Sequence, residues 1–184
     1  MQILKQVEGS VLWLTEGSVQ ARQNLYDEAK KRGISADRLV FAKRMDSLSD
    51  HLARYRLADL FLDTFIFNAH TTASDALWAG LPVLTCLGNT FAGRVAASLL
   101  NAVGLPELVT HSHEEYQALA VGLATNPAKL AAIKQQLAQN QLTHPLFNTA
   151  LFTEHIEDAF SQMWKRHQVA LLPNHIYVKA KGQT

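Results

Sequence analysis

Residues 60–85 decide the fold of this chain: residues 60–64 read LFLDT, residues 68–75 read NAHTTASD and residues 76–85 read ALWAGLPVLT. The first apolar run predicts a strand, and the hydroxyl residues after it are typical of the start of a helix. Gly80 and Pro82 predict the end of that helix, and the apolar run that follows predicts another strand. The stretch therefore predicts strand, loop, short helix and strand, with His70, Thr71 and Thr72 at the amino end of the helix.

The amino end of this predicted helix is a favourable place for an anion. The first turn of a helix leaves backbone N–H groups without partners, and the peptide dipoles add about half a positive charge there. Thr71 and Thr72 can donate to phosphate oxygens, His70 can donate or carry a proton, and Asp75 can accept from a sugar hydroxyl. We interpret this pattern as a nucleotide diphosphate site. The alternative is that Thr71 or Thr72 is an ordinary N-cap and His70 an ordinary loop residue.

The rest of the chain alternates between predicted strands and predicted helices. Apolar strands without a polar face are typical of a parallel sheet that helices cover on both faces, and the alternation predicts βαβ units with right-handed crossovers. Ligands of such sheets bind beyond the carboxyl ends of the strands. The predicted strands are residues 11–14, 38–41, 60–62, 82–85 and 108–109; the main predicted helices are residues 18–32, 48–56, 112–125, 127–140 and 149–167.

Composition excludes several classes of protein. The 184 residues suffice for one domain with a buried core, and 17 basic against 16 acidic residues leave a formal charge of +1, which gives no electrostatic footprint for nucleic acid. One cysteine, Cys86, excludes an internal disulfide and fits a reducing compartment, where it would be a small buried apolar residue. Without a signal sequence or a membrane-spanning run, we expect a cytoplasmic protein with no membrane partner.

A second group of candidate residues lies on the predicted helix of residues 48–56. His51 and Arg54 are three residues apart and therefore share a helix face. A flat imidazole and a flat guanidinium on one face can stack on a base and bind its edge or a diphosphate. The alternative is a solvated face on which Asp50 and Arg54 form an ion pair across one turn.

Residues 88–94, which read GNTFAGR, offer another loop before a helix. They lack the glycine and lysine spacing of a P-loop. Either this loop shapes a cleft beside His70, or Arg94 lies on an ordinary surface helix. Two other kinds of site are not predicted: His111 and His113 have no cysteine ligand close in sequence to complete a zinc site, and no Gly-x-Ser-x-Gly motif indicates a serine hydrolase.

Four ordered stretches resemble the C-terminal catalytic lobe of the O-linked N-acetylglucosamine transferase and SPINDLY family, in its bacterial form. They are residues 57–64, 68–80, 91–98 and 145–148, and the resemblance extends over residues 1–167. It implies a GT-B architecture, in which two Rossmann-like lobes face each other across a cleft. Residues 1–168 would be the C-terminal lobe with additional C-terminal helices, residues 169–184 would be a tail, and tetratricopeptide repeats would lie upstream.

The resemblance also implies a reaction and a role for each candidate residue. Family members transfer N-acetylglucosamine from UDP-N-acetylglucosamine to serine or threonine of proteins, with inversion and without a metal or other cofactor. Carried over by position, the diphosphate would be held by His70, Thr71 and Thr72, the ribose by Asp75, and the base by His51, Arg54 and the backbone around Met45. Two alternatives are a SPINDLY-type lobe that uses GDP-fucose and a non-catalytic nucleotide-binding or assembly module.

The chain departs from the family pattern in two places. Residues 46–50, which read DSLSD, lack the lysine that the family uses at the ribose, so that Lys43 or Arg44 would have to replace it. The family's lobe also begins with a further strand and helix that carry a diphosphate-binding lysine, and this chain starts after them. With the N-terminal catalytic lobe absent as well, we expect an incomplete active site with no catalytic residue, no sugar transfer by the chain alone, and an exposed sheet edge.

Overall fold

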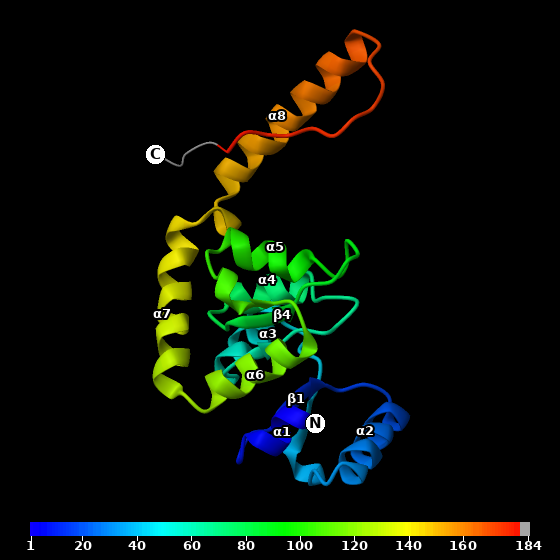
Figure 1. The fold of residues 1–184 in the computed structure, drawn as a ribbon, viewed down its shortest axis with the longest axis vertical. Helices are drawn as coiled ribbons and strands as arrows, with labels where there is room; N and C mark the ends of the chain where they lie inside the picture. Colours follow the sequence, from blue (N-terminus) through cyan, green and yellow to red (C-terminus); the bar gives the residue numbers. More distant parts are fainter. Residues whose placement is uncertain (181–184) are drawn as a thin grey trace.

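The computed structural model of the protein describes residues 1–180, over which short strands alternate with helices (Figure 1). The strands are β1 (Leu12–Thr15), β2 (Leu39–Ala42), β3 (Phe61–Leu62), β4 (Val83–Cys86) and β5 (Val109–Thr110). The α-helices are α1 (Gln2–Gln6), α2 (Val19–Lys31), α3 (Leu48–Arg54), α4 (Thr71–Trp78), α5 (Val95–Ala102), α6 (His113–Ala124), α7 (Pro127–Thr143) and α8 (Thr149–Gln168).

All strand pairs are parallel, as predicted, but they form two separate pieces. Strand β1 pairs with β2, with Leu12 beside Leu39, while β4 lies between β3 and β5. Within residues 1–180, no hydrogen-bonded ladder joins the two pieces. Strands β3 and β5 are two residues long, so the larger piece depends on helix packing more than on its ladders.

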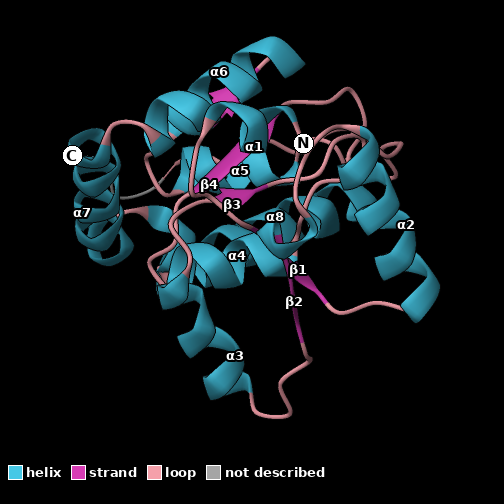
Figure 2. Cartoon of the chain, turned by 90° about the horizontal axis from the view of Figure 1, so that it is seen from below, coloured by secondary structure: helices cyan, strands magenta, loops and turns pink. Residues whose placement is uncertain are grey.

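Helices cover both faces of the larger sheet (Figure 2). Successive residues of a strand point to opposite faces, and in β4 the two faces have different partners. Val83 belongs to a cluster with residues of α4, α5 and α7, whereas Leu84 packs with residues of α6. The α/β class with helices on both faces is therefore confirmed.

The β1–β2 pair has a small core of its own. Leu4, Ala29, Ile34 and Leu39 are buried there, with α1 and α2 covering the strands. Helix α1 also contacts α6, because Ile3 packs against the cluster around Leu84. The N-terminal piece is thus joined to the larger one through α1 and the chain that follows β2.

Helix α4 ends as the sequence predicts. Gly80 has a φ of +83°, a conformation that glycine adopts without strain. The N–H of Gly80 donates to the carbonyl of Leu77 at 3.2 Å, and the N–H of Leu81 donates to that of Ala76 at 2.9 Å. This Schellman arrangement closes the helix and turns the chain directly into the next strand.

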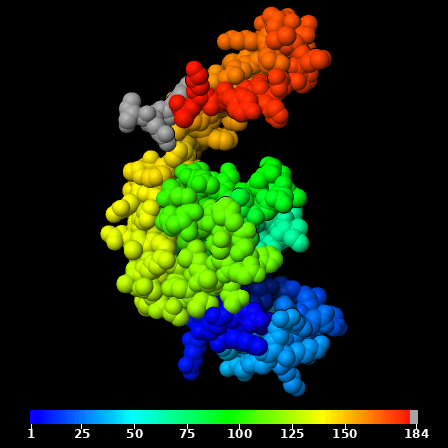
Figure 3. All heavy atoms as spheres, viewed as in Figure 1, coloured from blue at the N-terminus to red at the C-terminus, as the bar shows by residue number. Residues whose placement is uncertain are grey.

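Helix α8 projects away from the rest of the molecule (Figures 1 and 3). None of its residues is buried, and Phe152, Phe160 and Trp164 are each at least 60% exposed. Residues 169–180 form no helix or strand, and Arg166 donates to the carbonyl of Leu172 in this segment. The predicted tail at residues 169–184 lies partly outside the described residues. No helix in residues 1–180 has the length and apolar character to cross a membrane.

Candidate functional site

A cleft of about 470 Å³ opens where the chain passes from β3 into α4. Its walls come from the end of β3, the loop after it and the first turn of the helix. The lining residues are Phe61, Leu62, Asp63, Thr64, Phe67, Asn68, Ala69, His70, Thr71 and Thr72. Three of the seven predicted site residues therefore line one cleft, and all three come from the stretch predicted to hold a diphosphate.

The first turn of α4 leaves several donors free at this cleft. His70 is the N-cap, its carbonyl accepts from Ala73 and Ser74, and Thr71 and Thr72 begin the helix as exposed residues. Among residues 1–180, the N–H groups and hydroxyls of Thr71 and Thr72 have no hydrogen-bond acceptor. The alternative in which either threonine is an ordinary N-cap is therefore wrong, and both remain available to an anion.

The loop of residues 88–94 holds His70 from the side. The imidazole Nε2 lies 3.4 Å from the carbonyl of Ala92, and the His70 ring stacks on Phe67 with centroids 4.9 Å apart. Gly93 allows a close approach here, because a Cβ on it would lie 3.2 Å from the Ile66 carbonyl, a tight contact. The loop therefore contacts His70, but none of its residues lines the cleft, so that its role in shaping the cleft stays a prediction.

Asn68 contributes a buried acceptor to the cleft wall. Its N–H donates to the carbonyl of Ala92 and its Nδ2 to that of Thr64, each at 3.0 Å. Its Oδ1 is buried and has no donor within residues 1–180. Buried polar atoms without a partner are rare, and they are typical of places that a ligand or an ordered water completes.

Sequence reasoning did not single out Asp63, which is the most heavily bonded side chain of the cleft. Its carboxylate accepts from the N–H of Thr64 at 2.8 Å, the N–H of Ala69 at 2.6 Å and the hydroxyl of Thr85 at 2.6 Å. Burial raises the pKa of Asp63 above its ordinary value, although these hydrogen bonds and the charge of His70 lower it. An acidic residue at the end of an apolar strand was the one available signal.

The second group of predicted site residues, His51 and Arg54 on α3, does not line the cleft. His51 Nε2 is 3.4 Å from the hydroxyl of Tyr55. Burial raises the pKa of Tyr55, the charge of Asp75 raises it further, and Arg54 lowers it. Tyr55 is thus the residue through which the predicted base-side pair, His51 and Arg54, and the predicted ribose ligand, Asp75, come together.

Arg54 is not paired with Asp50. Its guanidinium donates to the carbonyl of Lys43 at 3.1 Å, and no ion pair joins Arg54 to an acid within the described chain. The alternative of an Asp50–Arg54 pair is wrong because this bond instead ties α3 to the loop before it. Met45 and Arg44 are exposed in that loop and do not line the cleft. Their roles at the base and ribose remain predictions.

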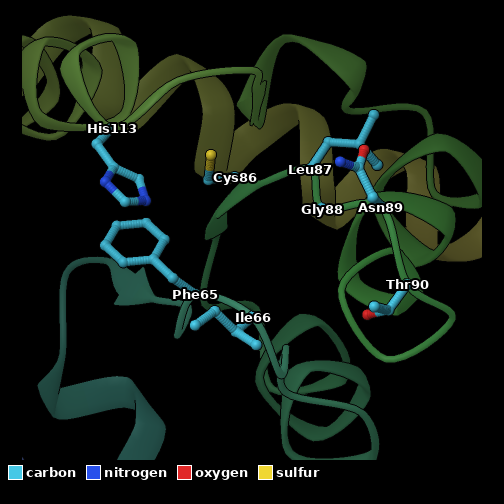
Figure 4. A pocket seen from close by; sticks show the side chains of 8 residues that line it. All are labelled: Phe65, Ile66, Cys86, Leu87, Gly88, Asn89, Thr90 and His113. Atoms are coloured by element: carbon cyan, nitrogen blue, oxygen red, sulfur yellow. The ribbon is translucent and has the colours of Figure 1, made fainter.

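A smaller cavity of about 240 Å³ lies on the other side of the loop after β3 (Figure 4). Phe65 and His113 pack against each other on one side of it with ring centroids 4.1 Å apart, and the loop of residues 87–90 forms the opposite wall. Cys86 is half-buried in this cavity rather than buried as predicted, and its thiol is free. In the described residues, no group of three or more His, Cys, Asp or Glu side chains is placed to hold a metal.

Comparisons with known proteins agree on one family. The profile of glycosyl transferase family 41 matches residues 1–156. The chain is 38% identical to the probable UDP-N-acetylglucosamine–peptide N-acetylglucosaminyltransferase SEC of Arabidopsis thaliana and 35% identical to the corresponding transferase of Caenorhabditis elegans. Both matches cover 96% of this chain, but it spans only 18% and 15% of the length of those proteins.

A solved structure shows the same fold. A mutant of the O-GlcNAc transferase of Thermobaculum terrenum superposes with a TM-score of 0.83 at 32% identity, over 92% of this chain and 33% of that one. This match confirms the predicted Rossmann-like lobe of a GT-B enzyme. Together with the profile match over most of its length, it shows that the chain belongs to glycosyl transferase family 41, the family of the O-GlcNAc transferases and SPINDLY proteins.

Proposed function

We propose that this chain is the nucleotide-sugar-binding lobe of a protein O-glycosyltransferase, with UDP-N-acetylglucosamine as the donor and serine or threonine of proteins as the acceptor. The observation that carries the proposal is the first turn of α4, where the N–H groups and hydroxyls of Thr71 and Thr72 face a cleft with no partner in residues 1–180. The names of the relatives in Arabidopsis and Caenorhabditis support the choice of UDP-N-acetylglucosamine as the donor and of a peptide as the acceptor.

The free donors suit the chemistry of a departing nucleoside diphosphate. The leaving diphosphate gains negative charge as the glycosidic bond breaks, and donors that are already in position stabilise that charge without reorganising. Helix N–H groups, two hydroxyls and the His70 imidazole offer this stabilisation without a metal. Removing one such donor typically costs about 2.7 to 4 kcal/mol in the transition state.

The remaining predicted roles follow the same arrangement. We propose that Asp75 binds the ribose and that His51, Arg54 and the backbone around Met45 bind the base. Tyr55 supports this division, because its hydroxyl lies 3.4 Å from His51 Nε2 and the charge of Asp75 raises its pKa. We also propose that the chain binds the donor and does not transfer sugar by itself.

The test is a thermal unfolding series of the full chain with UDP, GDP and neither. A ligand that binds only the folded state stabilises it by about 2.7 kcal/mol at a concentration 100 times its Kd. We expect UDP to raise the Tm in proportion to the logarithm of its concentration, and GDP to raise it less. No shift with either nucleotide would contradict the proposal.

A donor of the GDP-fucose type is the second candidate, which the sequence resemblance to the SPINDLY family leaves open. The chain is 32% identical to the probable transferase SPINDLY of Petunia hybrida, over 82% of its own length. A larger Tm shift with GDP than with UDP would favour this candidate. In either case, incubating the chain with labelled nucleotide sugar and acceptor peptides tests transfer, and robust labelling would overturn the proposal that it only binds.

A further inference from the structure

We propose that Asp63 is the positioning residue of the cleft, and that its buried carboxylate holds the loop of residues 64–70 so that His70, Thr71 and Thr72 face the diphosphate. The proposal rests on the proposed function for the identity of the ligand. Asp63 acts on the loop, whereas His70, Thr71 and Thr72 would contact the diphosphate.

Every polar group of Asp63 is bonded, and the bonds lead to three parts of the fold: β4, α6 and the loop. Its N–H donates to the carbonyl of Leu84 in β4, and its carbonyl accepts from the hydroxyl of Tyr116 in α6, each at 3.0 Å. Burial raises the pKa of Tyr116, which keeps that hydroxyl protonated as a donor. On the side chain, Oδ2 accepts from Thr85 in β4, while Oδ1 accepts from the two loop residues described above. Asp63 therefore joins β3, β4, α6 and the loop.

The two loop residues that bond the carboxylate are the two ends of the loop. Thr64 directly follows Asp63, and Ala69 directly precedes His70, the N-cap of α4. One carboxylate oxygen thus closes the loop at its base. The position of Ala69 sets where the N-cap starts, and hence where the free donors of the first turn point.

Burial contributes little to holding this loop, although the ring of Phe65 packs against His113 and Tyr116. The whole segment 64–67 is exposed, and Ile66 has a φ of +71°, a strained conformation for a β-branched residue. Asn68 is the one buried residue between the two ends. Hydrogen bonds to an ionised carboxylate are shorter and stronger than neutral ones, so they can carry what burial does not.

The site also explains why a carboxylate is used. An ionised carboxylate is an acceptor only, and the three groups that face it are all donors. Keeping a charge at this depth is unfavourable, because burial disfavours the ionised form. A buried carboxylate is unfavourable by itself, but here it accepts from three donors at the base of a strained loop. This pattern is expected of a residue that holds a binding site in position.

The test compares four variants of the full chain by UDP calorimetry and by amide hydrogen exchange. Asp63→Ala removes both acceptor oxygens, and we expect it to weaken UDP binding at least about tenfold, which corresponds to ~1.4 kcal/mol. Asp63→Asn keeps Oδ1 for Thr64 and Ala69 and presents its Nδ2 to the hydroxyl of Thr85, which can accept. We therefore expect Asp63→Asn to restore UDP affinity to within about threefold of the parent, a difference of less than 1 kcal/mol.

Two threonine variants provide the control and the fallback. Thr110→Val removes a buried hydroxyl that donates to the carbonyl of Thr85, on the far side of β4 from the loop, and we expect unchanged UDP affinity. Thr85→Val removes only the donor to Oδ2, and we expect faster amide exchange of Ala69 and a smaller loss of affinity than in Asp63→Ala. If Asp63→Ala does not fold, Thr85→Val decides the question.

The outcomes separate this proposal from the proposed function. A folded Asp63→Ala that binds UDP as the parent does, or a Thr85→Val with unchanged affinity and exchange, would overturn the positioning role. If the parent chain binds no UDP, the proposed function fails. The positioning role of Asp63 is then tested by amide hydrogen exchange alone. Faster exchange at Thr64 and Ala69 in Asp63→Ala than in Thr110→Val would support the positioning role, and equal exchange would reject it.

Discussion

Helices α4 and α8 differ in how far they are buried in the protein. Helix α4 is eight residues long, and three of them, Ala73, Ala76 and Leu77, are inaccessible to solvent. Helix α8 is twenty residues long and buries none of them. A binding site needs hydrogen-bond donors in a fixed position, and the packing of α4 against the core fixes the position of its first turn. The comparison indicates that the free first turn of α4 is preorganised, whereas the aromatic side chains of α8 remain largely exposed to solvent.

Truncating one apolar side chain on each helix gives the largest expected effect. Leu77→Ala should lower the free energy of unfolding by about 2 to 5 kcal/mol, because it leaves a cavity in the main core. Phe160→Ala, at a side chain that is 60% exposed, should change it by less than about 0.5 kcal/mol. Urea denaturation of the two variants measures both values. Equal losses would show that α8 is packed as firmly as α4.

Removing a threonine hydroxyl from the first turn of each helix sharpens the comparison. Thr71→Ala and Thr72→Ala should each weaken UDP binding by about 1.5 to 3 kcal/mol, the value of a hydrogen bond to a charged group. Thr149→Ala removes the same group from the first position of α8 and is the matched control. Calorimetry should show its affinity unchanged. An equal loss in Thr149→Ala would place the diphosphate elsewhere.

A smaller effect is expected at the strained loop before α4. Ile66 has a φ of +71° and is 85% exposed, so the strain has no compensation from burial. Asparagine tolerates this conformation, and Ile66→Asn should raise the free energy of unfolding by about 1 kcal/mol. Ile66→Val keeps the β-branch and is the control. The same urea series measures both, and a destabilised Ile66→Asn would contradict the assignment of strain.

The smallest effect depends on pH. Burial raises the pKa of Asp63 in the folded protein, so the folded state binds more protons than the unfolded state between the ordinary and the raised pKa. The contribution of Asp63 to stability is therefore complete below its ordinary pKa and is lost as pH rises through the raised value. Asp63→Asn should gain stability relative to the parent as pH rises from 4 to 7. A constant difference would contradict the shift.

The sequence was sufficient to predict the local structure. Apolar runs located all five strands, and the turn signals located the long helices α2, α6, α7 and α8. The start of α4 was predicted because hydroxyl residues directly after a strand are typical of the first turn of a helix. Each of these signals lies within a few residues of the feature that it predicts, and therefore a single sequence can reveal it.

Contacts between distant residues could not be predicted in this way. Asp63 meets Thr85 across 22 residues and Tyr116 across 53, and nothing in the local pattern indicates either partner. The same holds for Arg54, whose spacing from Asp50 favoured an ion pair that the Lys43 carbonyl replaces. The division of the sheet and the projection of α8 also depend on packing between elements, which periodicity does not describe.

The separate core of the β1–β2 pair implies that the chain opens in stages. Its cluster contains four buried residues, whereas the main cluster contains thirteen, and units with fewer buried contacts unfold first. The exposed Lys43 and Arg44 follow β2 directly and are sites for trypsin. Limited digestion should therefore cut between the two pieces early and release an N-terminal fragment, while the part that carries the cleft resists the protease for longer.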